Sequence, residues 1–418
     1  MSKKLLLIII LSLTLRLLSL NQSFWLDEAI SANVAKNYSY QNIIASFSSS
    51  DFHPPLYYLV LKAWSSVFGY SEFSLRLPSV IFSLITIFLV FKYFGFWPSL
   101  LLVSNPLYLY YSQEARMYSL ATLLVFCAFL AFQKKKVILY FLFTFLSLST
   151  FYGTIFFFAA ISLYWIIKKD SKNFAIYSLA PALSLLILLP LLMVQYQNSR
   201  SLLQSVQNWS SVLGPANLKN LFLIPIKFTL GRVSFYPKVL YYLLAFVLTV
   251  PLWFLIFLKS FQRRLTAFIF WSTLVIGFAF CLFTPMFQYF RFLYLLPFLA
   301  IILKKSFLYF FVFLIFSLVY LLNPAYHRED WKTLASNLSG SVYMIPSASD
   351  PVKYYRPDIE IKDLSGNITG AQITVIPYVT EIHGLDYKNK LKSLGFTLKK
   401  ISGFRQLTTE TWSREFRL

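Results

Sequence analysis

Most of this chain consists of apolar runs of about 15 to 25 residues, which are separated by short breaks that carry charge. A helix of that length crosses a hydrocarbon core of about 30 Å. The composition agrees, since 58% of the residues are hydrophobic and 13% are charged, against about 25% charged in soluble domains. We therefore expect an all-α polytopic membrane protein embedded in a lipid bilayer. About eleven runs could span the bilayer. They lie near residues 5–20, 76–94, 98–112, 118–133, 137–152, 154–167, 174–194, 239–258, 266–283, 289–303 and 306–322.

The short breaks rich in Lys and Arg occur at every second connection, starting with the N-terminus. They are Lys3-Lys4, Lys92, Lys134 to Lys136, Lys168-Lys169-Lys172, Lys259-Arg263-Arg264 and Lys304-Lys305. Because cytoplasmic loops carry the excess of basic residues, we expect all of these breaks and the N-terminus in the cytoplasm. An odd number of spans then places the C-terminus outside the cytoplasmic (plasma) membrane. The loops also account for the net charge of +22, so no nucleic-acid partner is expected.

Three long segments are expected on the outer side, namely a first loop at 21–75, a second loop at 195–238 and a tail at 323–418. Apolar stretches in the first loop suit amphipathic helices that lie in the membrane surface. The tail differs in kind, since it holds ten of the 16 acidic residues and has strand-like runs at 341–345 and 372–376. The sequence therefore predicts a transmembrane domain, 1–322, followed by a small soluble extracytoplasmic α/β domain, 323–418.

Acidic residues are scarce before the tail, and they gather on the expected outer side. The six that precede Asn323 are Asp27, Glu28, Asp51, Glu72, Glu114 and Asp170. Asp27 and Glu28 directly follow the first apolar run. Neighbouring carboxylates repel each other and point to different faces of a helix, which favours one catalytic and one structural role. The alternative is that both are interfacial polar residues at the end of the first span.

An enzyme that works at the outer leaflet needs a substrate held at the membrane surface, and a sugar carried on a polyprenyl phosphate is a common activated form. Such chemistry requires an apolar groove, cationic donors for the phosphate and a carboxylate that takes a proton from the attacking hydroxyl. The cations expected on the outer side are Lys62, Arg76, Arg116, Arg232 and Arg291. Arg291 lies inside an apolar run, where an arginine is expensive, although snorkelling to the headgroups is an alternative explanation.

Two further features have both a functional and a plain interpretation. Glu114 and Arg116 lie in a tight turn between apolar runs, where a local ion pair could hold the turn. His53 precedes two prolines, and it could bind a divalent metal cation with a nearby carboxylate, hydrogen-bond a phosphate, or cap a helix. A divalent metal cation is the one candidate cofactor. Cys127 and Cys281 both lie within apolar runs and indicate neither a disulfide nor a metal site.

Several motifs occur in order along the first 330 residues. They are Trp25-Leu26-Asp27-Glu28-Ala29, His53-Pro54-Pro55-Leu56-Tyr57-Tyr58, Ser71-Glu72 through Arg76-Leu77-Pro78-Ser79, Ser112-Gln113-Glu114-Ala115-Arg116-Met117-Tyr118, Tyr289-Phe290-Arg291-Phe292-Leu293-Tyr294-Leu295-Leu296-Pro297 and Arg328-Glu329-Asp330-Trp331. Together they resemble the GT-C superfamily of membrane glycosyltransferases. The resemblance is to the branch with the protein O-mannosyltransferases and the lipid A aminoarabinose transferase, especially bacterial proteins similar to dolichyl-phosphate-mannose-protein mannosyltransferases.

The resemblance implies an inverting glycosyltransferase that moves a sugar from a polyprenyl-phosphate donor to a hydroxyl on a protein, lipid or glycan. Asp27 would be the general base, supported by Glu28, and Glu114 would be the third catalytic group. The residues expected to bind the donor phosphate are Arg116, Arg291, Lys62, Tyr118 and Tyr289. The part of the tail beyond Trp331 matches no acceptor-recognition domain, so the acceptor is left open.

Two other classes of protein compete with this interpretation. A transporter or flippase of lipid-linked sugars would carry polar or broken helices at the midplane and often internal repeats, whereas the centres of these runs are almost wholly apolar. A non-catalytic envelope scaffold would use the outer tail to bind a partner, and it would not need the carboxylates and arginines of the first two outer segments.

Overall fold

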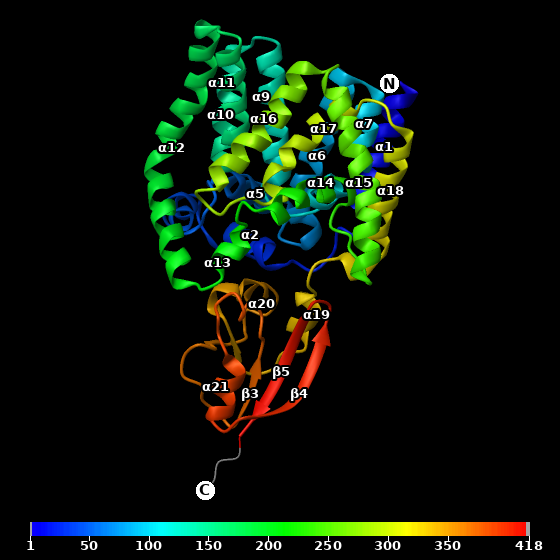
Figure 1. Ribbon diagram of the computed structural model, residues 1–418. Helices are drawn as coiled ribbons and strands as arrows, with labels where there is room; N and C mark the ends of the chain where they lie inside the picture. Colours follow the sequence, from blue (N-terminus) through cyan, green and yellow to red (C-terminus); the bar gives the residue numbers. More distant parts are fainter. Residues whose placement is uncertain (1, 415–418) are drawn as a thin grey trace.

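The computed structural model describes residues 2–414 and shows a helical bundle with a small sheet-containing unit at one end (Figure 1). Residues 415–418 of the expected C-terminal domain lie outside the described residues. The bundle helices are α1 (Lys3–Leu17), α6 (Glu72–Phe94), α7 (Phe96–Ser104), α8 (Pro106–Ser112), α9 (Tyr118–Gln133), α10 (Val137–Thr150), α11 (Ile155–Ile167), α12 (Ser171–Ser205), α14 (Leu218–Leu230), α15 (Lys238–Ser260), α16 (Arg264–Cys281), α17 (Leu296–Leu303) and α18 (Phe307–Leu322).

Shorter elements connect these helices. The first connection contains α2 (Leu26–Asn37), α3 (Tyr40–Asn42), the π-helix η1 (Ile43–Phe47), α4 (Ser48–Ser50) and α5 (Leu56–Phe68). The other connecting elements are α13 (Trp209–Leu213) and the 3-10 helices η2 (Tyr152–Thr154), η3 (Tyr289–Leu295) and η4 (Pro324–Tyr326).

Four helices are long and apolar enough to cross a membrane, namely α6, α12, α15 and α16. Five shorter apolar segments accompany them within residues 2–414, at Tyr118–Gln133, Val137–Thr150, Tyr152–Ile167, Tyr289–Leu303 and Phe307–Leu322. Each apolar run of the sequence therefore contains helix, as expected of a multi-pass membrane protein. The expected total of about eleven spans is not established, because many of the helices are shorter than a full crossing.

The run at 98–112 is not the single span that its hydropathy predicts, because the helix breaks at Asn105 between α7 and α8. Pro106 has no backbone N–H and disfavours a helical conformation in the residue before it. Asn105 accordingly has an extended backbone, and its side chain accepts a hydrogen bond from the Tyr108 amide at 2.9 Å. Its amide group also donates to the Phe228 carbonyl of α14 at 2.9 Å. Asn105, at the break, therefore links the α7–α8 segment to α14.

The expected second outer loop, 195–238, is also largely helical. α12 continues to Ser205, and α14 packs against α8 and α15 with Phe228 and Leu230 fully buried. The sequence prediction erred here because α14 is only 13 residues long and contains Pro225, so it shows no membrane-length run. The result is an additional helix next to the segment that carries Arg232.

The C-terminal unit has a mixed five-stranded sheet in the order β2-β1-β3-β5-β4. Its elements are α19 (Trp331–Ser336), β1 (Val342–Met344), η5 (Pro346–Ala348), α20 (Asp350–Tyr355), β2 (Ile361–Asp363), β3 (Gln372–Val375), α21 (Tyr387–Ser393), β4 (Thr397–Phe404) and β5 (Leu407–Ser413). β1 pairs in parallel with β2 and β3, and the pairs β3–β5 and β4–β5 are antiparallel. β1 and β3 coincide with the two strand-like runs, so the expected α/β character is present.

This unit is docked on the end of the bundle that carries α2 and α5 (Figure 1). α2 packs against α20, and the Asn33 amide donates to the Asp350 carboxylate at 2.8 Å. Lys332 forms an ion pair with Glu72 at 3.0 Å, which ties α19 to the start of α6. The first acidic pair of the chain therefore lies near the junction between the bundle and the sheet-containing unit.

Candidate active site

Asp27 and Glu28 both lie in the first turn of α2, where the partial positive charge of the helix N-terminus favours carboxylates. Successive residues of a helix point about 100° apart, so the two side chains face different surroundings. The Asp27 side chain is 33% exposed, whereas that of Glu28 is 1% exposed. The expectation that the two acids have different surroundings thus agrees with their positions.

Glu28 is held on both oxygens by buried donors. Arg76 of α6 donates from Nε to Oε1 at 2.8 Å and from Nη2 to Oε2 at 2.6 Å, which is a two-pronged guanidinium–carboxylate pair. The Ala115 amide donates to Oε1 at 2.8 Å. Glu28 therefore joins α2, α6 and the turn between α8 and α9. Arg76, one of the cations expected to face a phosphate, is also engaged here.

Asp27 is held much more loosely, by Arg116 from the turn between α8 and α9. The Arg116 Nη2 lies 3.4 Å from the Asp27 Oδ2, and the Asp27 carboxylate accepts no hydrogen bond from residues 2–414. Arg116 Nη1 lies 3.5 Å from the Tyr58 hydroxyl, at the limit of a hydrogen bond. The Nε of Arg116 is buried and has no partner among the described residues. A partly exposed carboxylate thus lies beside a guanidinium that has a free donor.

Tyr58 connects this pair to a second acid, Asp51, which precedes α5. The Tyr58 hydroxyl donates to Asp51 Oδ2 at 2.8 Å, and His53 Nδ1 lies 3.3 Å from the same oxygen. Burial by itself would raise the pKa of Asp51, but the attraction of His53 and the hydrogen bonds lower that pKa to about 2. Among residues 2–414, no group of three or more His, Cys, Asp or Glu side chains gathers around His53. Asp51 is its one acidic contact in the described chain.

Glu114 does not pair with its neighbour Arg116, so the local ion pair that could have held this turn is not formed. Instead, Arg328, which follows η4, donates to Glu114 Oε1 from Nη2 at 2.8 Å and from Nε at 3.2 Å. The guanidinium of Arg328 also stacks on the Trp25 ring, 3.7 Å from its centroid. Burial raises the pKa of Glu114 by more than the nearby Arg328 lowers it, and its Oε2 has no partner within residues 2–414.

The remaining expected phosphate ligands are distributed around this centre. Tyr118, at the start of α9, lies within electrostatic range of both Arg116 and Arg291, and its ring is 5.7 Å from that of Phe290. Arg291 is half-buried and forms no ion pair with any described residue. Tyr289 also packs against Phe290, at 5.5 Å between ring centroids, and lies within electrostatic range of Arg232. Tyr118 is thus the link between the two arginines.

Lys62 occupies a different place. Its Nζ donates to the Ala35 carbonyl in the last turn of α2 at 3.3 Å and lies 5.6 Å from the centre of the Tyr40 ring. Ala35 is eight residues from Asp27, which corresponds to about 12 Å along the helix. Lys62 thus stabilises the end of α2 and is not brought to Arg116.

Three residues of this site were not singled out from the sequence. Arg328 belongs to a recognised motif, but it was given no role. Asp51 carried a signal, because it is one of the few acids of the first outer segment. Tyr58 ends the motif that begins at His53, but it was given no role, because a tyrosine in an apolar helix is also typical of a core position.

Comparisons with known proteins bear on the fold. No protein-family model and no curated protein matches the chain. Among solved structures, the chain is similar to ArnT from Cupriavidus metallidurans in the apo state, with a TM-score of 0.56, 10% identity and 97% of each chain covered. It is similar to the same protein bound to undecaprenyl phosphate, with a TM-score of 0.56, 11% identity and the same coverage. At this identity the similarity concerns the fold alone, and a fold shared with ArnT agrees with the resemblance expected from the sequence motifs.

Proposed function

We propose that this protein is an inverting glycosyltransferase that moves a sugar from a polyprenyl-phosphate donor to a hydroxyl acceptor at the outer face of the cytoplasmic membrane. The observation that carries the proposal is the loose pair of Asp27 and Arg116, in which a partly exposed carboxylate lies 3.4 Å from a guanidinium with an unpaired buried Nε. The likeness of the whole chain to a fold seen with undecaprenyl phosphate supports a donor of this class.

The Asp27 carboxylate is the general base of the proposed reaction. The acceptor oxygen attacks the anomeric carbon while its proton passes to Asp27, and the bond from that carbon to the phosphate oxygen breaks on the opposite side. Attack from the side opposite the leaving group inverts the anomeric centre. Because the carboxylate accepts no hydrogen bond from the described residues, its oxygens are available to the hydroxyl.

The leaving polyprenyl phosphate gains negative charge, and arginine is well suited to receive it. Arg116 offers its unpaired Nε, and Arg291 offers a guanidinium that is not neutralised by any carboxylate of residues 2–414. Tyr118 lies within electrostatic range of both arginines and would orient the phosphate, and Tyr289 packs against Phe290. Glu28 and Glu114 contribute by fixing the turn that carries Arg116, since they bind Ala115 and Arg328.

Asp51 and His53 would provide an oxygen and a nitrogen ligand if a divalent cation binds beside Arg116, and such an ion would help to neutralise the phosphate. Lys62 supports this assembly from the end of α2, through its bond to the Ala35 carbonyl.

The orientation in the membrane follows from the two ends of the bundle. The basic breaks lie at the end opposite the sheet, where Lys4 lies over Phe96 and Lys305 over Trp97. By the positive-inside rule that end, with the N-terminus, is cytoplasmic. Asp27, Arg116 and the C-terminal domain are then extracytoplasmic. The proposed transfer of the lipid-linked sugar takes place on that side of the membrane.

The test is transfer by the purified protein in detergent, with a polyprenyl-phosphate sugar as donor and product formation as the readout. Removing a preorganised catalytic group costs about 100-fold or more in rate, so Asp27→Asn is expected to lose transfer while its thermal unfolding stays unchanged. Near-parental turnover by Asp27→Asn would refute the assigned base. A flippase would form no product in detergent at all, because there is no second compartment.

A further inference from the structure

A second cluster of cations lies where the bundle meets the C-terminal unit, and it lines a cavity of about 150 Å³. The lining comes from α8, from the segment between α14 and α15, from the segment that follows α18 and from the turn between β4 and β5. The lining residues are Tyr110, Arg232, Ser234, Ala325, Tyr326, His327, Arg328 and Gln406. None of these side chains is a carboxylate, so the cavity is lined by basic and uncharged side chains.

The two arginines flank the same aromatic ring. The Arg232 guanidinium lies 5.0 Å and that of Arg328 5.3 Å from the centre of the Tyr110 ring. Arg232 Nη1 also donates to the Tyr110 hydroxyl at 3.0 Å. Each guanidinium lies within electrostatic range of the other, and this repulsion is a cost that a bound anion would remove.

The positive charge of the cavity is only partly compensated. Arg232 forms no ion pair with residues 2–414, whereas Arg328 is paired with Glu114 alone. Lys238 adds a further cation at the rim, since its Nζ donates to the Ser234 hydroxyl at 3.2 Å. Guanidinium groups in a partly buried site bind oxyanions with short, charge-assisted hydrogen bonds.

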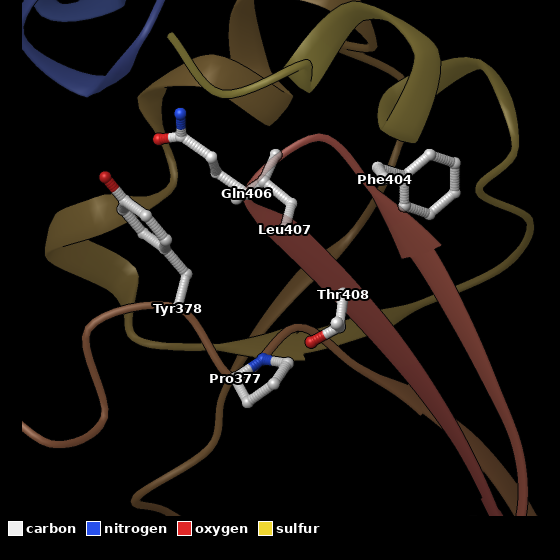
Figure 2. Close-up of a pocket in the computed structure, with 6 residues that line it drawn as sticks. All are labelled: Pro377, Tyr378, Phe404, Gln406, Leu407 and Thr408. Atoms are coloured by element: carbon white, nitrogen blue, oxygen red, sulfur yellow. The ribbon is translucent and has the colours of Figure 1, made fainter. Parts of the chain in front are cut away.

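Gln406 links this cavity to a second one on the C-terminal unit. The second cavity measures about 250 Å³ and is lined by Pro377, Tyr378, Phe404, Gln406, Leu407 and Thr408. Figure 2 shows Tyr378 and Gln406 extending toward the same side of the sheet, with Thr408 and Pro377 farther along. A ligand with its anionic group at the arginines could therefore continue over aromatic and hydroxyl groups, which are the surfaces that saccharides contact.

We propose that the Arg232–Arg328 cavity binds a phosphate or carboxylate group of the acceptor, so that the acceptor is an acidic saccharide or a lipid with such a headgroup. This inference rests on the proposed function, and it gives the C-terminal domain the role of acceptor recognition. The donor phosphate belongs elsewhere, because it must lie across the anomeric carbon from Asp27. Neither Asp27, Arg116 nor Tyr58 lines this cavity.

The proposal is tested by equilibrium binding to the purified full chain in detergent, with inorganic phosphate and undecaprenyl phosphate as separate probes. A charge-assisted hydrogen bond contributes about 1.5–3 kcal/mol, so Arg232→Gln should weaken inorganic phosphate about tenfold or more. The same variant should keep its affinity for undecaprenyl phosphate within about threefold. Arg200→Gln is the matched control, because Arg200 also lies over a tyrosine ring, at 5.7 Å from Tyr196, but is exposed on α12.

Ser234→Asp provides an independent test, since it places a negative charge in the cavity without removing an arginine. It should also weaken the binding of inorganic phosphate about tenfold or more. Asp27→Asn should bind inorganic phosphate normally, so failure of the transfer reaction and failure of this site are separable. Unchanged phosphate binding by both Arg232→Gln and Ser234→Asp would overturn the proposal. An equal loss of undecaprenyl phosphate in Arg232→Gln would also overturn it, because the cavity would then be the donor site.

Discussion

The two ends of the helical bundle differ in how their charged side chains are paired. At the end remote from the sheet, lysines such as Lys92 and Lys134 lie over the ring of Tyr93, and Lys259 donates to the Leu303 carbonyl. At the other end, each acid before the tail in the segments that the sequence predicts outside contacts a cationic partner or a histidine. These contacts are Asp27–Arg116, Glu28–Arg76, Asp51–His53, Glu72–Lys332 and Glu114–Arg328.

The difference teaches what each charge contributes. A lone exposed lysine keeps its hydration, so it can orient the chain in a membrane at little cost. A buried charge has lost its hydration and needs a partner, so removing one member of a buried pair is far more damaging than removing an exposed lysine. We therefore expect substitution of a lysine at the basic end to change stability little, and substitution of one member of a buried pair at the other end to lower stability strongly.

The largest effect is expected for Glu28→Gln, which leaves Arg76 charged and buried without its carboxylate. Breaking such a pair costs about 3–5 kcal/mol, and the yield and thermal midpoint of the purified protein should fall sharply. Adding Arg76→Gln to this variant removes the uncompensated charge and should recover part of the midpoint. If Glu28→Gln unfolds like the parental protein, the buried pair is not what stabilises this end.

Next comes Arg116→Gln, which should lower transfer about 100-fold with a much smaller change in thermal midpoint. The reason is that Arg116 holds Asp27 only loosely, at 3.4 Å, and is proposed to act on the leaving phosphate. Initial rates at saturating donor measure the effect. A fall in stability as large as that of Glu28→Gln would instead make Arg116 a structural residue and erase the contrast between Asp27 and Glu28.

A smaller effect is expected from pH at Asp51. Because the folded-state pKa is lowered from 3.8 to about 2, the stabilisation is complete above the ordinary pKa and is lost as the pH falls toward the folded value. This difference corresponds to about 2 kcal/mol. Thermal midpoints between about pH 5 and about pH 2 should therefore drop less steeply for Asp51→Asn than for the parental protein. Glu360→Gln, which removes an exposed carboxylate of the C-terminal unit, serves as the control and should follow the parental curve.

The smallest effect belongs to the basic end. Lys134 is exposed and contacts the Tyr93 hydroxyl at 3.0 Å, so Lys134→Gln should change stability by less than about 0.5 kcal/mol. Its transfer rate in detergent should equal that of the parental protein, since no orientation in a membrane is needed there. A marked loss of activity in detergent would show that the two ends do not differ in the way described.

Much of the fold could be predicted from the sequence, because hydropathy acts through local runs of residues. The helices of the apolar runs and the strands β1 and β3 were expected from such runs. The break at Asn105 and the helix α14 were missed, since one depends on a single proline and the other on a short segment that packs on its neighbours. The site was predictable in its residue types, because acids and arginines are rare in such a chain.

The pairing of those residues was not predictable. Spacing suggests that Glu114 would pair with Arg116, two positions away, but their partners are Arg328 and Asp27. The partner of Glu114 is 214 positions distant in the chain. No local pattern encodes such a contact, because it depends on where the C-terminal unit docks on the bundle.

The sequence by itself determined that this chain is a membrane-embedded helical bundle with an α/β tail and that its few acids gather toward one side. These properties follow from the free-energy cost of placing polar groups in hydrocarbon, because that cost depends on the type of each residue and not on its neighbours in space. Only the tertiary structure decided which carboxylate is exposed, which is locked by an arginine and which reaches the tail. A buried charge is stable only beside a partner, and that partner can come from any part of the chain.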